Sequence, residues 1–190
     1  MAYQYQSVWK KTTPELITEL TDFWVRENAL PKGAQPARRA EQVVMVMRDD
    51  ADGSIVAVSS VIARVVPRLR QVLYYYRTFC AEKHRRNNTS IPIMQATQTA
   101  LREYNLSLPK PEAIGIIVEI ESAYINQRYP EAIWETGFSF IGYSPRGLPV
   151  RVFYFQGFKL QPPVRIARAQ GAAGNRAGGA GATRQRRRPN

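Results

Sequence analysis

Cysteine and histidine are almost absent from the 190-residue sequence, which contains only Cys80 and His84. A single cysteine excludes an intrachain disulfide framework and fits a protein that works in a reducing compartment. One cysteine with one histidine also supplies too few of the usual ligands for a structural metal site, so we expect no metal. No apolar run is long enough to span a bilayer and no charged-then-apolar leader is present, so we expect a soluble, cytoplasmic protein that does not enter a membrane.

Acidic residues are absent from positions 161–190, a segment with seven arginines and many Gly and Ala residues. The chain has 27 Lys and Arg against 15 Asp and Glu, a net charge of +12. The tail therefore carries +7, and the rest of the chain carries +5. Because the tail has few large apolar side chains, it cannot bury enough surface to offset the entropy of ordering. We expect residues 162–190 to be disordered.

Four of the tail arginines form a cluster near the C-terminus, namely Arg184, Arg186, Arg187 and Arg188. Such a cluster attracts phosphates in a way that depends on salt and largely ignores base sequence. The tail is therefore a candidate nucleic-acid-binding segment. The alternative is a basic tail that only keeps the chain in solution.

Residues 1–161 have the length of one compact domain, in which helix-like and strand-like patterns alternate. A helix is predicted over residues 13–29, because Thr13-Pro14-Glu15 is a good helix start and an apolar stripe follows it. The stripe consists of Leu16, Leu20, Phe23 and Trp24. Three strands are predicted next, a hairpin over 42–48 and 54–66 and an aromatic strand over 72–80.

The second half of the domain continues with a helix whose apolar residues recur at helical spacing over residues 90–104. The near-continuous apolar run at 113–120 predicts a central strand that is buried on both faces. We expect a short helix over 130–136 and a closing hairpin over 138–155, whose last strand covers 148–155.

The polar segment from His84 to Ser90 connects the aromatic strand to the following helix. Ser90 is the expected N-cap, and the free N–H groups and positive dipole end of the helix favour an anion there. Arg85 and Arg86 add full positive charges, so we expect a phosphate-bearing ligand. The alternative is that both arginines are solvated surface charges. We expect His84 to contact the loop or the phosphates and not to act as a base.

The loop from Arg85 to Ser90, with the sequence RRNNTS, resembles the pyrophosphate-binding loop of the GNAT superfamily of N-acyltransferases. The family pattern is Arg/Gln-x-x-Gly-x-Gly/Ala, so Asn88 and Ser90 stand where the family usually has small residues. Asn is the next most tolerant residue of the left-handed conformation after Gly. Gly137-Phe138 is similar to the pair that opens the closing hairpin of the family, and the order of elements matches from about 13 to 160.

The resemblance implies an α/β fold with a mixed, mostly antiparallel central sheet flanked by helices. It also implies acetyl-CoA or another acyl-CoA as the cofactor, with its pantetheine arm paired to the backbone at the end of the aromatic strand. The cofactor-binding residues are then Phe79, Cys80, Ala81, Arg85, Arg86, Asn87, Asn88, Thr89 and Ser90.

Acyl transfer to an amine needs a base for the amine and a donor for the departing thiolate. Glu119 and Glu121 lie at the end of the central strand on one face, and partial desolvation would raise the pKa of such a carboxyl group. The alternative is that both carboxylates simply lie in water where the strand ends. Ile133 occupies the position of the family's tyrosine, so Tyr124 and Tyr129 are the candidate donors.

Two functions from different classes follow. The first is an N-acyltransferase that moves an acyl group, such as acetyl, to an unidentified amine on a small molecule or a macromolecule. The second is a non-catalytic GNAT-like scaffold or binding module whose tail binds nucleic acid. The missing loop glycines and tyrosine favour the scaffold, whereas the order of elements and the Arg-rich loop favour the enzyme. The oligomeric state stays open.

Overall fold

The computed structural model describes residues 2–30, 33–85 and 87–165. Its elements, in chain order, are β1 (Tyr3–Ser7), α1 (Pro14–Arg26), α2 (Pro36–Ala40), β2 (Val43–Asp49), β3 (Ile55–Val66), β4 (Gln71–Cys80), the 3-10 turn η1 (Glu82–His84), α3 (Ser90–Ser107), β5 (Gly115–Glu119), α4 (Ala123–Arg128), β6 (Ser139–Tyr143) and β7 (Pro149–Tyr154).

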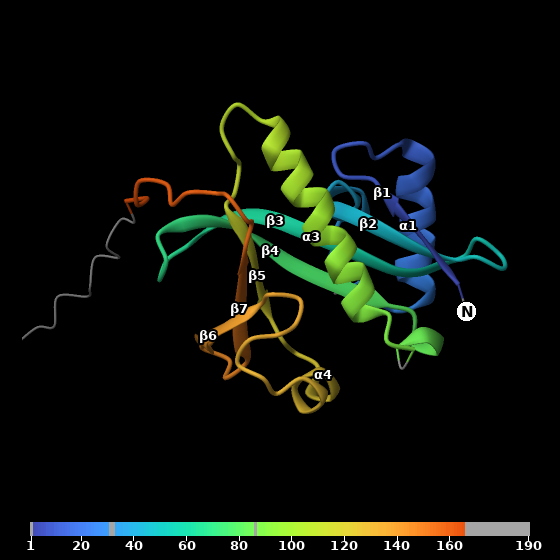
Figure 1. Cartoon of the computed structure of the whole chain (residues 1–190). Helices are drawn as coiled ribbons and strands as arrows, with labels where there is room; N and C mark the ends of the chain where they lie inside the picture. Colours follow the sequence, from blue (N-terminus) through green and yellow to red (C-terminus); the bar gives the residue numbers. More distant parts are fainter. Residues whose placement is uncertain (1, 31–32, 86, 166–190) are drawn as a thin grey trace, which may run out of the picture.

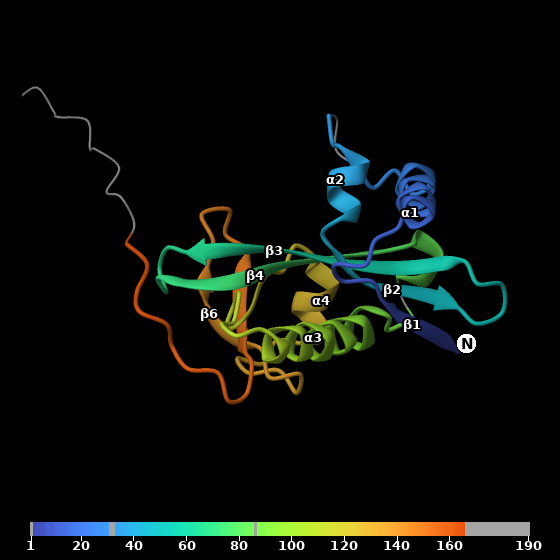
Figure 2. The same ribbon diagram turned by 90° about the horizontal axis from the view of Figure 1, so that it is seen from above.

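The strands of the described residues form one sheet in the order β1-β2-β3-β4-β5-β7-β6 (Figure 1). Every neighbouring pair is antiparallel except β4 and β5, which run parallel. Helices α1 and α2 lie on one face of the sheet and α3 lies on the other (Figure 2). The predicted α/β fold, with a mostly antiparallel sheet flanked by helices, is confirmed.

Helix α1 begins as the sequence predicts. The Thr13 hydroxyl accepts a hydrogen bond of 3.3 Å from the main-chain N–H of Leu16, and Pro14 lies in the first turn, where a missing N–H costs little. Phe23 and Trp24 are fully buried against β2 and β3, and each contributes roughly 1.5–3 kcal/mol of apolar burial. The helix ends at Arg26, earlier than the predicted end near residue 29.

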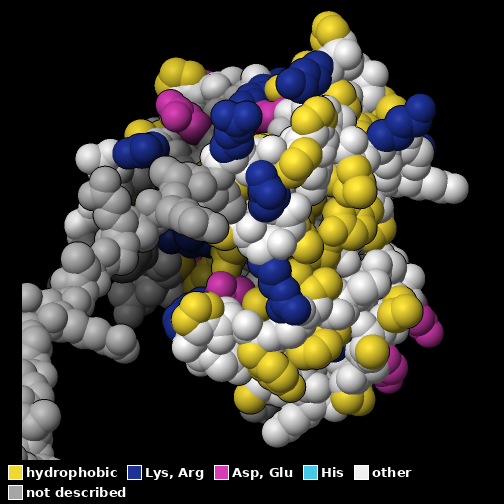
Figure 3. All heavy atoms as spheres, turned by 90° about the vertical axis from the view of Figure 1, so that its left-hand side faces the viewer, with side chains coloured by type: hydrophobic (Ala, Val, Ile, Leu, Met, Phe, Trp, Pro, Cys, Tyr) yellow, Lys and Arg dark blue, Asp and Glu magenta, His cyan; other side chains and the backbone are white. Residues whose placement is uncertain are grey.

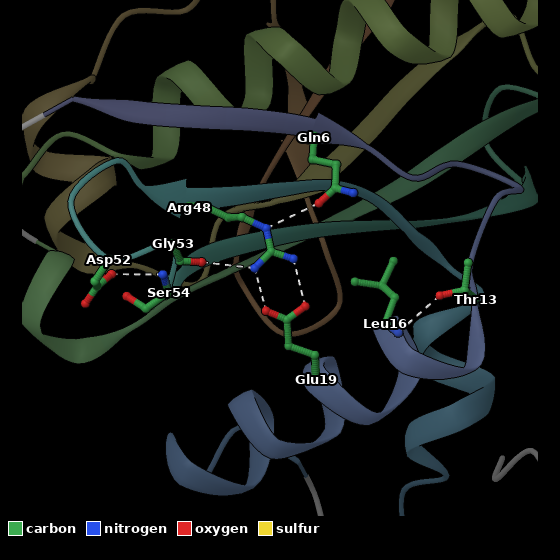
Figure 4. A network of polar contacts seen from close by, with 8 residues as sticks. All are labelled: Gln6, Thr13, Leu16, Glu19, Arg48, Asp52, Gly53 and Ser54. Carbon is green, nitrogen blue, oxygen red and sulfur yellow. Dashed lines mark hydrogen bonds and ion pairs between the residues drawn. The ribbon is translucent and has the colours of Figure 1, made fainter.

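An ion pair joins α1 to the sheet (Figure 4). The guanidinium of Arg48 on β2 donates to both carboxylate oxygens of Glu19 on α1, with 2.7 Å between Nη2 and Oε2. The same guanidinium donates to the Gln6 side chain on β1 at 3.3 Å and to the Gly53 carbonyl in the β2–β3 turn at 3.1 Å. Because one planar group on β2 contacts α1, β1 and the β2–β3 turn, it fixes their relative positions.

Helix α3 packs on the opposite face, and its C-terminal end is tied to the start of β5. The buried Asn105 amide donates to the Tyr74 hydroxyl at 3.0 Å and accepts from the N–H groups of Glu112 and Ala113 at 2.9 and 3.1 Å. The Tyr74 hydroxyl donates in turn to the Glu112 carboxylate at 2.9 Å. Burial is the main cause of the raised pKa of Tyr74, to which Glu112 also contributes. This network places β5 beside β4.

The predicted helix over residues 130–136 is wrong, because the helix lies earlier, over α4. Ser122 is its N-cap and accepts from the N–H of Ile125 at 3.3 Å. Residues 130–136 instead form a loop around the buried Trp134, whose Nε1 donates to the Tyr129 carbonyl at 2.9 Å. Arg151 of β7 supports this loop, since it donates to the Ala132 carbonyl at 3.2 Å and lies over the Trp134 ring. Tertiary contacts of one aromatic ring thus outweigh local helix preference.

At the C-terminal end, the last described residues run along the β3–β4 turn. The Val164 N–H donates to the Arg70 carbonyl at 3.0 Å, and the Gln161 N–H donates to the Gln71 side chain at 2.9 Å. The predicted boundary between residues 161 and 162 stays a prediction. The four clustered arginines, from Arg184 to Arg188, lie outside the described residues.

On the face in Figure 3, Lys and Arg side chains are spread over the surface and few acidic ones are visible, as the +5 charge of the body implies. Among residues 2–30, 33–85 and 87–165, no helix has the length and apolar character needed to cross a membrane.

We expect Glu19→Gln to lower the free energy of unfolding by about 1 kcal/mol at neutral pH, because a charged bidentate pair is lost while shape is kept. The hydrogen bond from Arg48 is the main cause of the lowered pKa of Glu19, so this stability is present above the pKa of the unfolded chain and is lost as the pH falls. Urea unfolding at pH 7 and pH 3 measures it. A difference between wild type and variant that does not shrink at pH 3 would contradict the assignment.

Candidate functional site

The parallel strands β4 and β5 pair over only two residue pairs, Tyr74 with Ile116 and Tyr75 with Ile117. Beyond them the strands separate. On its other edge β4 stays paired with β3 as far as Cys80, and β5 stays paired with β7 as far as Glu119. A cleft of about 1050 Å³ lies at this separation. The edge of β4 that faces the cleft therefore has free main-chain N–H and C=O groups.

Strand alternation gives the cleft two different halves. Tyr76 and Val118 face α3, whereas Tyr75, Arg77 and Glu119 face the side of α1 and α2. We name the apolar part the α3 half, lined by Tyr76, Ile91, Met94, Val118, Ile120, Ile125 and Trp134. We name the polar part the α1 half, lined by Ala29, Arg39, Arg64, Tyr75, Arg77, Glu119 and Arg146.

The N-terminus of α3 opens onto the cleft. Thr89, not Ser90 as predicted, is the N-cap, and its side chain makes no capping hydrogen bond. Its hydroxyl instead donates to the His84 carbonyl at 3.3 Å. Ser90 and Ile91 line the cleft, and first-turn N–H groups have no intrahelical acceptor. This end of the helix can therefore donate hydrogen bonds to an anion.

The loop before α3 has the backbone that a glycine would supply in the family pattern. Asn88 has a φ of +55°, and its side-chain oxygen accepts a hydrogen bond of 3.0 Å from the Tyr129 hydroxyl. Arg85 lines the cleft, donates through Nε to the Cys80 carbonyl at 3.2 Å and stacks on the Phe79 ring. Arg86 lies outside the described residues.

His84 lies buried beneath this loop. Its Nδ1 is 3.3 Å from the Tyr3 hydroxyl, and it does not line the cleft. It has the position of a loop contact, the first of the two roles expected for it.

The α1 half holds the carboxylates predicted for chemistry. Glu119 accepts hydrogen bonds from the Tyr75 hydroxyl and, at 2.6 Å, from Arg146, which also contacts Glu121 at 2.9 Å. The Glu119 side chain is 18% exposed, whereas that of Glu121 is 69% exposed. Arg146 comes from the turn between β6 and β7 and therefore crosses the open end of the cleft.

The expected rise in the pKa of the Glu119 carboxyl group is wrong. Burial does raise its pKa, but the hydrogen bonds from Tyr75 and Arg146 outweigh burial and leave it below its ordinary value. Burial, with the hydrogen bond to Glu119, raises the pKa of Tyr75 to about 12. Glu119 is thus ionised at neutral pH and Tyr75 is protonated.

Seven predicted site residues line the cleft, namely Phe79, Cys80, Arg85, Ser90, Glu119, Glu121 and Tyr124. Others lie behind it. Ala81 is buried, and its main-chain N–H donates to the Val56 carbonyl. The loop before α3 contains Asn87, Asn88 and Thr89, and Tyr129 connects it to the end of α4 through Asn88. Among the described residues, no group of three or more His, Cys, Asp or Glu side chains could hold a metal ion.

Several lining residues were missed from the sequence, chiefly Arg39, Arg64, Arg77 and Arg146. Alternation along the aromatic strand could have placed Arg77 on the face of Tyr75. Arg39 and Arg146 come from a five-residue helix and a turn, whose sequences carry no periodic signal for where they lie.

Comparison with known proteins gives a likeness of structure only. No family model matches the sequence, and no curated protein matches it. The ribosomal-protein-S5-alanine acetyltransferase of Vibrio fischeri superposes with a TM-score of 0.58 and 9% identity, covering 83% of this chain and 95% of that one. A GNAT family acetyltransferase of Brucella melitensis, in complex with acetyl-CoA, superposes with a TM-score of 0.50 and 11% sequence identity. The match covers 86% of this chain and 94% of that one.

A mutant of the toxin AtaT bound to the C-terminus of the antitoxin AtaR gives a TM-score of 0.52 and 8% identity over 80% of this chain and 93% of that one. At these identities the likeness establishes the fold. The chain is therefore a divergent protein with the GNAT fold, as the sequence resemblance predicted.

We expect Asn88→Ala to destabilise the protein by about 1–2 kcal/mol, because alanine is disfavoured at a positive φ. Asn88→Gly keeps the backbone and loses only the hydrogen bond from Tyr129, so it should cost less. Tyr129→Phe is the matched control, since it removes the same bond without changing residue 88. Thermal unfolding of the three variants measures the order of their stabilities. Equal losses of stability in Asn88→Ala and Asn88→Gly would refute the backbone argument.

Proposed function

We propose that the protein is an acyl-CoA-dependent N-acyltransferase that transfers an acyl group, with acetyl as the first candidate, to an amine acceptor. The observation that supports this proposal most is the cleft between β4 and β5, which is lined at one end by the N-terminus of α3 and by Arg85. The GNAT fold supports the proposal, and the likeness to a structure in complex with acetyl-CoA supports the choice of donor.

The residues of the cleft fit an acyl-CoA. When bound, it supplies an acyl group activated as a thioester. Its diphosphate needs several hydrogen-bond donors, which the first turn of α3 and the Arg85 guanidinium can provide. The edge of β4 from residue 76 to residue 79 has no partner strand on this side and offers main-chain groups to the amide-containing pantetheine arm. The Cys80 carbonyl beyond it accepts from Arg85. The α3 half offers an apolar wall to the acyl chain.

The transfer forms a C–N bond and breaks the C–S bond, so one proton must leave the nitrogen and one must reach the sulfur. In the proposed mechanism Glu119 takes the first proton, since it lies in the α1 half and is ionised. Its low pKa is sufficient, because the amine nitrogen becomes acidic as the C–N bond forms. Tyr75 cannot take this role, since its pKa of about 12 keeps it protonated.

Tyr124 is the proposed proton donor to the departing sulfur. It lines the cleft from α4, and the residue is 51% exposed, so water can return the proton. Tyr129, the other candidate, donates to Asn88 and supports the loop. Glu121 is the weaker choice of base because its side chain lies mostly in solvent.

The scaffold alternative, the nucleic-acid-binding tail and the cytoplasmic location stay predictions from the sequence. The arginine cluster at 184–188 lies outside the described residues. Among the described residues, the cleft is an observation that the enzyme explains and that a scaffold does not require.

Binding of the donor is the first test. We expect acetyl-CoA at about 100 times its dissociation constant to stabilise the fold by roughly 2.7 kcal/mol. Arg85→Ala should weaken binding about tenfold, or roughly 1.4 kcal/mol, because one charged donor is lost. Arg102→Ala on α3 is the matched control, since this arginine does not line the cleft. Isothermal titration measures both. The absence of binding of acetyl-CoA, CoA and longer acyl-CoAs would favour the scaffold.

The pH dependence of the reaction tests the base. We expect the rate of CoA release, with an amine acceptor found by screening, to fall as the pH drops through the pKa of Glu119. Arg146→Gln removes a hydrogen bond that lowers this pKa, so the fall should begin at a higher pH. Glu119→Gln should reduce kcat by about 10²- to 10⁴-fold and abolish this fall of the rate at low pH, the acid limb of the profile.

Arg68→Gln is the control for Arg146, since Arg68 donates to the Ile141 carbonyl of β6 and does not line the cleft. An acid limb that is the same in wild type and Arg146→Gln would exclude Glu119 as the base.

A further inference from the structure

The α1 half of the cleft contains more positive charge than its own carboxylates can balance. Five arginines line the cleft, and Arg146 already pairs with both of its glutamates, Glu119 and Glu121. The other four, Arg39, Arg64, Arg77 and Arg85, make no ion pair with any carboxylate of the described residues. A concave surface with this charge attracts anions.

The four arginines lie in two places. Arg85 comes just before the N-terminus of α3, where the diphosphate of the donor is proposed to bind. Arg77 lies on the side of α1 and α2, because it alternates with Tyr76 on β4. Arg64 shares that side, since its partner Leu73 has the same parity as Tyr75. Arg39 comes from α2, which covers this face (Figure 2). The donor phosphates do not account for these three.

Arg39 is held in place although it has no acidic partner. Its guanidinium lies 5.3 Å from the centre of the Trp24 ring, and its Nη1 is 3.5 Å from the Ala29 carbonyl. The side chain is half-buried, and burial together with the charge of Arg77 lowers its pKa. A held, partly desolvated guanidinium beside a second cation is unfavourable unless an anion joins them. The arrangement is thus prepared for a ligand.

We propose that the α1 half binds an amine acceptor that also carries an anionic group, a phosphate or a carboxylate, and that Arg39 and Arg77 hold this group. The inference rests on the proposed N-acyltransferase activity for the amine. Glu119 lies in the same half of the cleft, and each of its carboxylate oxygens has a second lone pair that can accept a hydrogen bond from the neutral amine of the acceptor. The anionic contact and this hydrogen bond then orient one molecule along the cleft, with its nitrogen directed at the β4–β5 opening.

Matched amines test the proposal by binding, which needs no turnover. The full chain is saturated with CoA and titrated with O-phosphoethanolamine, β-alanine and ethanolamine. The first two carry a phosphate and a carboxylate, and ethanolamine carries no anion. We expect at least one anionic amine to bind at least tenfold more tightly than ethanolamine, and its affinity to fall with salt. Whichever of the two anionic amines binds more tightly shows whether the site prefers a phosphate or a carboxylate.

Arg39→Ala and Arg77→Ala should each weaken the anionic amine at least tenfold and leave the affinity for acetyl-CoA unchanged. Arg38→Ala is the matched control, because Arg38 is the neighbour on α2 and lines a different surface. Ethanolamine binding as tightly as both anionic amines, or equal affinity of the anionic amine for both variants and wild type, would overturn the proposal. Loss of acetyl-CoA affinity in Arg39→Ala or Arg77→Ala would also overturn it, since these residues would then hold the donor.

The two proposals fail separately. Acetyl-CoA titration of the wild type tests the donor site, whereas the amine titration tests the α1 half. A chain that binds acetyl-CoA but does not distinguish the three amines keeps the proposed activity and loses the anionic acceptor.

Discussion

The separation of β4 from β5 after two residue pairs is the constraint on which the site depends. Its cause lies on the outer edges of both strands. β3 holds β4 along its whole length, and β7 holds β5 over five residue pairs. Gly115 allows β7 to approach closely, because a side chain there would collide with the Phe153 carbonyl. Each strand therefore follows its outer partner, and main-chain groups along the inner edges lack a partner strand. Such groups need a hydrogen-bonding guest or water.

The charges in the cleft follow from this geometry. Because side chains alternate along a strand, opening the sheet exposes a polar row and an apolar row at once. Arg146 is the cation that pairs with Glu119, and the β6–β7 turn brings it across the opening. Its guanidinium helps to hold the pKa of Glu119 below its ordinary value and also pairs with Glu121. The remaining arginines are the ones that we propose to select an anionic acceptor.

Regular elements were predictable from local physics, whereas the site was only partly so. The hairpin over β2 and β3, the aromatic strand and α3 follow from periodicity, whereas the anion site inferred from Arg85 preceding a helix stays a prediction. The pKa of Glu119 was predicted in the wrong direction, because Arg146 is distant in sequence and its contact depends on the packing of a turn. The helix predicted at 130–136 was wrong for a similar reason. Trp134 is buried beside Arg151, and this contact depends on tertiary packing that the local sequence does not reveal.

Asn88 keeps the backbone of the loop before α3 without the glycine of the family pattern. Asn88 reaches the left-handed backbone at some cost, and the bond from Tyr129 offsets part of it while tying the loop to the end of α4. α4 in turn carries Tyr124 into the cleft. A glycine at position 88 would have the backbone freedom but no side chain to make this connection. The loop that is proposed to hold the phosphates and the helix that is proposed to protonate the sulfur are therefore positioned by one contact.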